Sequence, residues 1–191
     1  MKNILLIALL LGGVTLAQAD IKKVFDDNGK LKYERQYKNG KLHGVSRGYY
    51  PSGKLKVTSQ FYNGIAWGKT MGYYENGKVK ADIPMVNGKI DGVQKEYYDN
   101  GQLRSVQRFS MDIPTGTKRV YFPDGNMKAR INFNDEGKMQ GSAKEYYKGG
   151  KLKYTLKLEN GKAIKGYLYD KKGERTDMTA QDFKNMGLET L

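Results

Sequence analysis

Apolar and polar residues alternate along short segments of this chain. The apolar positions of the repeated segment are Leu31, Tyr33, Tyr37; Leu55, Val57, Phe61; Val79, Ala81, Ile83; Met127, Ala129, Ile131, Phe133; and Leu152, Tyr154, Leu156, Leu158. Polar residues occupy the positions between them, as Lys32, Glu34 and Gln36 do in the first segment. Because successive side chains of a β-strand point to opposite faces of its sheet, the alternation predicts strands with one apolar and one polar face.

Glycine-containing turn signals separate these strands. One set lies at Asn28-Gly29, Ser52-Gly53, Asn76-Gly77, Asn100-Gly101, Asp124-Gly125, Gly149-Gly150 and Lys172-Gly173. A second set lies at Asn39-Gly40, Asn63-Gly64, Asn87-Gly88, Glu136-Gly137 and Asn160-Gly161. Asn-Gly is favoured where both central residues of a tight hairpin turn need positive φ. Two turns per unit predict two strands per unit.

A signature of one glycine, four residues and two aromatic residues returns about every 24 residues. The opening glycines are Gly44, Gly68, Gly92, Gly116, Gly141 and Gly166. The aromatic pairs are Tyr49-Tyr50, Tyr73-Tyr74, Tyr97-Tyr98, Tyr121-Phe122 and Tyr146-Tyr147. A fixed period is the mark of stacked units. We therefore expect an all-β fold, an elongated antiparallel sheet of tandem β-hairpin repeats.

Aromatic residues and glycines refine the expected packing. The two tyrosines of each pair should point to opposite faces, and packing is favoured over a ligand-binding aromatic platform because the pairs recur at one structural position. The opening glycine is expected to let a neighbouring ring lie against the backbone. Trp67, at a turn end, is either a partly exposed contact or, the favoured alternative, a cap on the adjacent repeat.

Three residues interrupt the pattern. Asp112 takes the place of a second-turn glycine, and Pro84 and Pro114 lie where continuous ladder pairing is awkward. Local bulges or widened loops are expected there.

The two ends of the chain differ from the repeats. Residues 1–19 are typical of a signal peptide with cleavage after Ala19, the alternative being an uncleaved anchor. Residues 20–173 form the repeat array. In residues 174–191, Thr179 and Asp182 precede an apolar stretch, which predicts one short helix. The helix should cap the last repeat, with partner binding as the minority alternative.

Composition narrows the classes of function. The formal net charge is +14, which favours anionic partners, although solubility alone also explains it. The chain has no cysteine, which excludes thiolate metal sites, disulfides and acylation on cysteine. The signal segment, and not the absence of cysteine, predicts a periplasmic or secreted protein.

The unit resembles a known repeat family. The segments Tyr49–Lys56, Tyr73–Lys80 and Tyr97–Arg104 agree in spacing, and they resemble the bacterial variant of the MORN (membrane occupation and recognition nexus) repeat over about residues 24–173. The resemblance implies a sheet of successive hairpins, no cofactor, and a role in protein or membrane association. Members of this variant are often labelled antitoxins.

The sequence offers no evident catalytic centre. His43 is the only histidine, and it lies at a strand entry where a turn or surface role is favoured. Glu96 and Glu145 hold equivalent positions in different repeats, so they are poor candidates for a carboxylate pair. The sequence therefore predicts a protein that is not an enzyme and has no metal site and no cofactor.

One set of basic residues is a candidate site for anionic surfaces. It consists of Lys32, Lys56, Lys80, Arg104, Lys128 and Lys153, each three residues after a first-turn glycine. We call it the basic ladder; it is expected on the polar face with a spacing of about 10 Å, because two strands separate its members. It either contacts an anionic polymer or membrane, or only keeps the sheet soluble and discourages edge pairing, the favoured alternative.

Three functional hypotheses follow. The leading one is an exported, non-enzymatic scaffold that binds another macromolecule at the envelope or a host surface, with a protein as the favoured partner. The second is an antitoxin or immunity protein, and the third binds anionic lipid or polysaccharide. Nucleic acid is a weaker candidate partner, and end-to-end self-association through unpaired strands is a further option.

Overall fold

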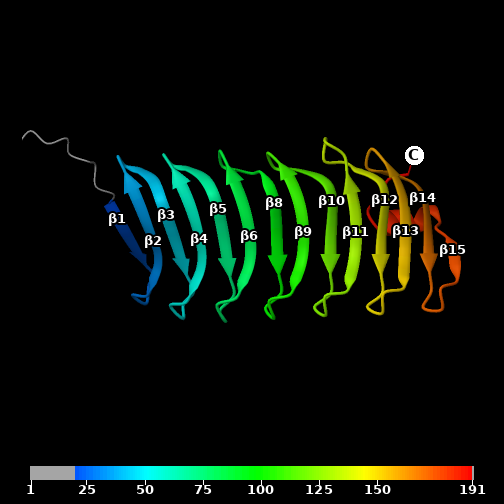
Figure 1. The fold of residues 1–191 in the computed structure, drawn as a ribbon, viewed down its shortest axis with the longest axis horizontal. Helices are drawn as coiled ribbons and strands as arrows, with labels where there is room; N and C mark the ends of the chain where they lie inside the picture. The colour runs from blue at the N-terminus through cyan, green and yellow to red at the C-terminus, as the bar shows by residue number, and fades with distance from the viewer. Residues whose placement is uncertain (1–19, 191) are drawn as a thin grey trace, which may run out of the picture.

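The computed structural model describes residues 20–190, which form one antiparallel sheet and one short helix (Figure 1). The predicted signal peptide, residues 1–19, lies outside the described residues. The strands are β1 (Asp20–Phe25), β2 (Leu31–Lys38), β3 (Lys41–Tyr49), β4 (Leu55–Tyr62), β5 (Ile65–Tyr73), β6 (Val79–Val86), β7 (Lys89–Ile90), β8 (Gly92–Tyr97), β9 (Leu103–Ser110), β10 (Ile113–Tyr121), β11 (Met127–Phe133), β12 (Met139–Tyr146), β13 (Leu152–Glu159), β14 (Lys162–Tyr169) and β15 (Arg175–Asp177). The helix α1 spans Ala180–Asn185.

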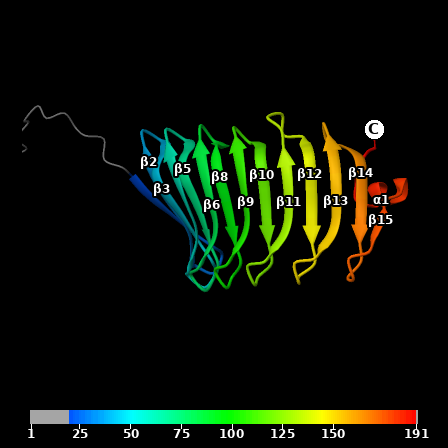
Figure 2. The ribbon, with the colours of Figure 1, turned by 45° about the vertical axis from the view of Figure 1, so that its right-hand side comes forward.

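The strands pair in chain order across a single layer. Each strand is hydrogen-bonded to the one before and the one after it, except that the short β7 pairs only with β6, which pairs on to β8. The sheet therefore runs from β1 at one end to β15 at the other without a crossover (Figures 1 and 2). The predicted all-β, elongated, antiparallel repeat architecture is confirmed.

The two kinds of turn have different geometry, except that the Glu136-Gly137 turn of the second set has the geometry of the first. In the second turn between β4 and β5, Asn63 and Gly64 have φ angles of 48° and 88°, as a two-residue turn of the Asn-Gly type requires. In the first turn before β2, the Asp26 side chain accepts hydrogen bonds from the amides of Asn28 and Lys30 at 2.9 Å. Both sets of turns fall where the glycine pairs predict them.

The turn between β9 and β10 stays tight without glycine. Met111 and Asp112 have φ angles of 49° and 74°, and Ser110 pairs directly with Ile113, so the expected widened loop does not form. The Asp112 carboxylate accepts a hydrogen bond of 2.6 Å from the Ile90 amide of the preceding turn. This bond connects the β9–β10 turn to β7, which follows the preceding second turn.

The interruption expected near Pro84 is present. The chain after the second turn forms only the two-residue β7, and β8 resumes at Gly92, with two residue pairs joining β6 to β8. Pro84 has no amide hydrogen, and its carbonyl accepts from the Asp91 amide at 3.1 Å. Pro114, in contrast, lies within its ladder opposite Phe109.

Among the opening glycines, a ring lies beside Gly166 alone, as expected, and the other five have no aromatic ring at their Cβ positions. The Gln36 side chain fills the space beside Gly44, where its Oε1 accepts a hydrogen bond of 2.9 Å from the Val45 amide. A ring cannot lie beside Gly44 because the Gln36 side chain of β2 occupies that space while it caps the Val45 amide at the bulge. Gly166 departs from the signature, since Tyr169 follows it by three residues and the signature requires five.

The core lies at the C-terminal end of the sheet. The buried apolar side chains are Ala143, Leu156, Leu158, Ala163 and Phe183. Phe183 comes from α1, which lies beside β14 and β15 (Figure 2). A Cβ atom on Gly166 would overlap the Phe183 ring, so glycine at this position lets the helix approach the sheet. Apolar side chains in the other repeats are mostly half-buried, because one layer covers only part of their surface.

The two ends of the sheet differ. At the C-terminal end, β15 covers part of β14, and the Glu189 carbonyl accepts a hydrogen bond of 2.7 Å from the Ala163 amide. At the other end, all six residues of β1 are exposed, and among the described residues no strand pairs with its outer side. Within the described residues, β1 is therefore the longer of two open edges, since the outer side of the three-residue β15 also pairs with no strand.

Candidate binding surfaces

The basic ladder occupies bulges in the sheet. Between β3 and β4, Gly48 pairs with Val57 and Tyr49 pairs with Leu55, which leaves Lys56 without a partner residue. The same shift occurs in the strand pairs of the five remaining ladder residues. A bulge redirects the side chain of its extra residue. The alternation rule that placed the ladder on the polar face therefore fails at this position.

The ladder cations lie over aromatic rings. The Nζ atoms of Lys56 and Lys80 are 5.5 and 5.6 Å from the ring centroids of Tyr50 and Tyr74. Arg104 and Lys128 lie similarly over Tyr98 and Phe122, and Lys32 over Tyr33. Each ring is thus covered by a cation from the following strand, or in the first unit from the same strand, a favourable arrangement for charge and ring.

The prediction that the ladder lies on the polar face is wrong at the N-terminal end. Lys32 and Lys56 line one hollow together with Leu31, Tyr33 and Val57, which belong to the apolar set. Their charges sit above rings at the first-turn edge and do not form a free row on the opposite face. Five of the six ladder residues are nevertheless exposed, and the half-buried Lys153 is the exception.

The second aromatic residue of each pair links consecutive repeats. The hydroxyl groups of Tyr50, Tyr74 and Tyr98 donate hydrogen bonds of 2.7 to 2.8 Å to the backbone carbonyls of Tyr73, Tyr97 and Tyr121. Tyr147 donates in the same way to the carbonyl of Tyr169 at 3.0 Å. These half-buried tyrosines have a packing role, as the sequence favoured.

The polar face carries a continuous row of side chains that the sequence analysis missed. Cross-strand pairing aligns one residue from each strand of the main path: Lys23, Glu34, Arg47, Thr58, Met71, Asp82, Lys95, Val106, Arg119, Arg130, Lys144, Thr155, Tyr167 and Asp177. Directly opposite residues share a face of the sheet. The units differ in length, so the row cannot be identified by counting along the sequence. The cross-strand register is needed to align its members.

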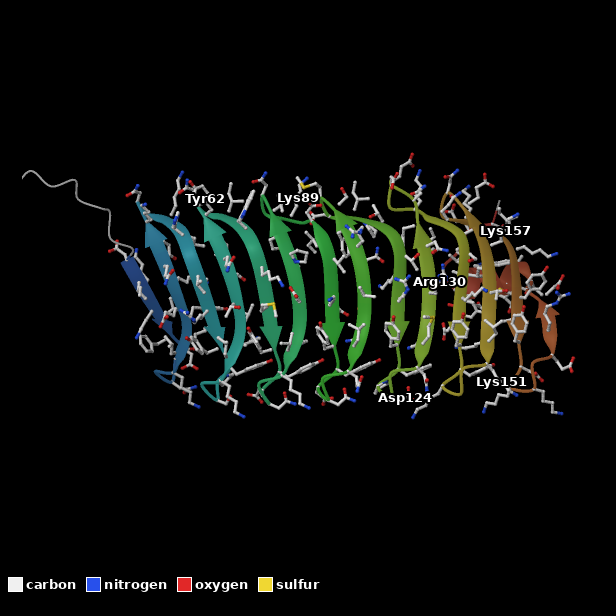
Figure 3. All side chains as sticks on the ribbon, viewed as in Figure 1. Tyr62, Lys89, Asp124, Arg130, Lys151 and Lys157 are labelled. Atoms are coloured by element: carbon white, nitrogen blue, oxygen red, sulfur yellow. The ribbon has the colours of Figure 1, made fainter. Side chains whose placement is uncertain are left out.

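Charges along this row are balanced in one half of the sheet and unbalanced in the other. In the N-terminal half Arg47 forms a 3.1 Å ion pair with Glu34, and Asp82 forms one of 3.1 Å with Lys69. In the C-terminal half Arg119, Arg130 and Lys144 follow one another on β10, β11 and β12, a set we call the cation cluster (Figure 3 labels Arg130). Within residues 20–190 none of its members forms an ion pair.

The family follows from the repeat. The model of the MORN repeat variant matches residues 21–39, 42–63, 68–87, 90–110, 114–135 and 139–162, which together make up more than half of the chain. The chain belongs to the MORN repeat variant family. A comparison with curated proteins gave no match. MORN repeats are generally binding modules, compatible with protein or lipid partners, and their all-β fold is typically non-catalytic.

One ladder residue of this MORN array has a local partner. Lys153 forms a 2.9 Å ion pair with Glu145, which lies directly opposite Tyr154. Burial of the Tyr154 phenol, together with its hydrogen bond to the Glu145 carboxylate, raises the pKa of Tyr154 to about 12. Because Lys153 is already paired with Glu145, it is the ladder residue least suited to contact an anionic ligand.

Trp67 and His43 lie near the second-turn edge of the MORN array. Trp67 is 49% exposed, which corresponds to the partly exposed contact and not to the favoured cap on the adjacent repeat. The His43 ring packs against Tyr62 at a centroid distance of 5.2 Å. Its Nδ1 atom is buried and has no hydrogen-bond partner among the described residues.

Acidic groups of the array stay apart. Glu96 accepts a 3.0 Å hydrogen bond from Ser105, and Glu145 is held by Lys153 in a different repeat. In the described part of the chain, no three His, Asp or Glu side chains converge on a point where they could hold a metal ion. Across residues 20–190 there is no helix of sufficient length and apolarity to span a membrane.

Proposed function

We propose that this MORN repeat protein is an exported, non-enzymatic scaffold that binds a macromolecule carrying anionic groups at the cell envelope or outside the cell. Export is inferred from the signal-like residues 1–19. The scaffold role is supported by the family and by the single open layer, which leaves both faces of most repeats accessible.

The cation cluster is the observation that carries this proposal. Neighbouring strands of a sheet are about 4.8 Å apart, so three positive charges at opposing positions repel one another. Arg119 and Arg130 are exposed, and other repeats of the same row place an acid or a neutral residue between cations. An anionic ligand would relieve the repulsion, and the guanidinium groups can each bind a carboxylate or phosphate through two hydrogen bonds.

The test compares the protein of residues 20–191 with a variant carrying Arg119→Ser, Arg130→Ser and Lys144→Ser. Heparin beads, vesicles with anionic lipid and envelope extract provide the anionic probes. At least one probe should retain the protein at low salt, retention should fall with rising salt, and the variant should bind at least about tenfold more weakly. Absence of retention on all three probes at low salt would refute the proposal.

The basic ladder provides the matched control. A variant with Lys56→Ser, Lys80→Ser and Lys128→Ser removes the same net charge from positions that lie over rings. If it loses retention as much as the cation-cluster variant, binding reflects overall charge and not this cluster.

An antitoxin role is a second candidate function. The family resemblance supports it, and it predicts that one enzyme co-purifies stoichiometrically and is inhibited. Anionic lipid as the ligand predicts flotation with anionic vesicles at low salt and none with zwitterionic vesicles.

A further inference from the structure

An apolar hollow lies on the second-turn edge of the sheet, away from the cation cluster. It has a volume of about 410 Å³ and is lined by Tyr62, Ile65, Trp67 and Asn87. Tyr62 is 61%, Ile65 50% and Trp67 49% exposed. Three large apolar side chains thus face solvent at one place.

The hairpin of β4 and β5 brings these side chains together. Tyr62 and Ile65 are directly opposite across the Asn63-Gly64 turn, and Trp67 is two residues beyond Ile65 on the same side of β5. Asn87 comes from the next second turn. The hollow therefore spans two consecutive repeats, and it depends on their alignment, which the Gly88 amide supports by donating to the Ala66 carbonyl at 2.9 Å.

The repeat fold does not require these residues. The positions equivalent to Tyr62, Ile65 and Trp67 in the neighbouring units are Lys38, Lys41, His43; Val86, Lys89, Asp91; and Ser110, Ile113, Thr115. Those units form the same kind of second turn, and none of them has tyrosine or tryptophan at these three positions. Exposed aromatic and branched side chains that the fold does not need mark a contact surface, and Trp and Tyr are the residues that dominate binding energy in such surfaces.

Positive charge flanks the hollow on both sides. Lys38 and Lys41 pair across the preceding second turn, and Lys89 lies on the following one, along the same edge of the sheet as Tyr62 (Figure 3). All three are exposed, and none forms an ion pair with any described residue. The surface thus combines an apolar centre with a cationic rim.

We propose that this hollow is a docking site for a partner protein, and that it takes one apolar side chain from a segment whose flanking residues are acidic. The apolar side chain packs between Trp67 and Tyr62, and the acidic residues on either side reach Lys41 and Lys89. This inference rests on the proposed role as a binding scaffold but uses a different surface from the cation cluster.

The test is selection from a displayed library of random 12-residue peptides on the protein of residues 20–191. Enriched peptides should contain one apolar residue with acidic neighbours. A variant with Tyr62→Ser and Trp67→Ser should bind them at least about tenfold more weakly, since a buried aromatic contact is typically worth more than a factor of ten. Ile113→Ser, which removes an exposed side chain at the position equivalent to Ile65, should leave binding unchanged and is the matched control.

Fluorescence gives an independent readout because Trp67 is the only tryptophan. A selected peptide without tryptophan should shift Trp67 emission to shorter wavelength and saturate, and Lys41→Ser with Lys89→Ser should weaken it at least about threefold at low salt. The cation-cluster variant should bind the peptide normally, so failure of that cluster and failure of this site are distinguishable.

Three results would overturn the inference: no enriched peptide, enrichment of basic peptides, or equal binding to the Tyr62 and Trp67 variant whose circular dichroism matches the wild type. A neutral oligosaccharide that shifts Trp67 emission when no peptide does would assign the hollow to carbohydrate instead.

Discussion

At the residue scale, the second aromatic position joins the units of this MORN array. Its hydroxyl group binds the backbone of the next unit, and a cation from the following strand covers its ring. Phe122 breaks this series, since it keeps the ring and the covering Lys128 but has no hydroxyl group. Tyr74 and Tyr98 donate to the carbonyl of the first aromatic residue of the next pair. The corresponding acceptor for a hydroxyl group at position 122 is the Tyr146 carbonyl.

Phe122→Tyr should stabilise the array. A new hydrogen bond to the Tyr146 carbonyl contributes about 0.5 to 1.5 kcal/mol. The urea midpoint should rise, whereas Tyr98→Phe, the matched removal of an existing bond, should lower it by a similar amount. A fall in the midpoint for Phe122→Tyr would show that the unit after Phe122 is not aligned as described.

Met111→Asn should also stabilise the protein. A positive φ is unfavourable for methionine and well tolerated by asparagine, a difference of about 1 kcal/mol. Asp112 is left in place because its carboxylate holds the Ile90 amide. Thermal unfolding measures the effect, and Asn87→Met in the preceding turn should destabilise by a comparable amount.

Titration of Tyr154 should weaken the C-terminal repeats at high pH. Its pKa is raised from 10 to about 12 in the folded protein, so its contribution is complete below pH 10 and is lost as the pH rises toward 12. Urea unfolding between pH 9 and pH 12 measures this loss. Tyr154→Phe should remove this part of the pH dependence; an unchanged profile would contradict the assignment.

At the scale of elements, α1 covers the end of the array where the last hairpin would expose its apolar side. The Thr179 side chain accepts from the Asp182 amide, and the Asp182 carboxylate accepts from the Thr179 amide, so a capping box starts the helix. Two further contacts, through β15 and Glu189, hold the segment to β14.

Phe183→Ala should loosen this end without unfolding the rest. Loss of a buried phenylalanine costs about 3 to 5 kcal/mol, and in a repeat array the effect acts on the neighbouring units first. Hydrogen exchange should accelerate in β13 and β14 and stay near the wild-type rate in β3 to β6. Uniform acceleration throughout the sheet would contradict a local cap.

The sequence was sufficient for strands and turns but not for the sites. Asn-Gly pairs located the second turns because both residues need positive φ, and alternation located the strands. Alternation placed Lys32 and Lys56 on the wrong face, because each is the extra, unpaired residue of a bulge and a bulge changes the direction of its side chain. The row through Arg119, Arg130 and Lys144 depends on the pairing register, which no count along the chain provides.

At the scale of the whole molecule, the sheet carries different surfaces on its two faces and two edges. The polar face is charge-balanced toward β1 and cationic over β10 to β12. The second-turn edge carries the apolar hollow, and β14 is covered at the other end. Of the two edge strands in residues 20–190, β1 is the longer, and Lys22 and Lys23 on it discourage association between copies. The architecture therefore favours binding of separate partners along one extended scaffold.

Small-angle X-ray scattering of the protein of residues 20–191 tests the central claim that consecutive hairpins form one extended layer. Fourteen strands in a row, spaced by about 4.8 Å, give a length of about 60 Å and a radius of gyration of about 20 Å. A value of about 16 Å, which is expected for a compact globule of this size, would contradict the account.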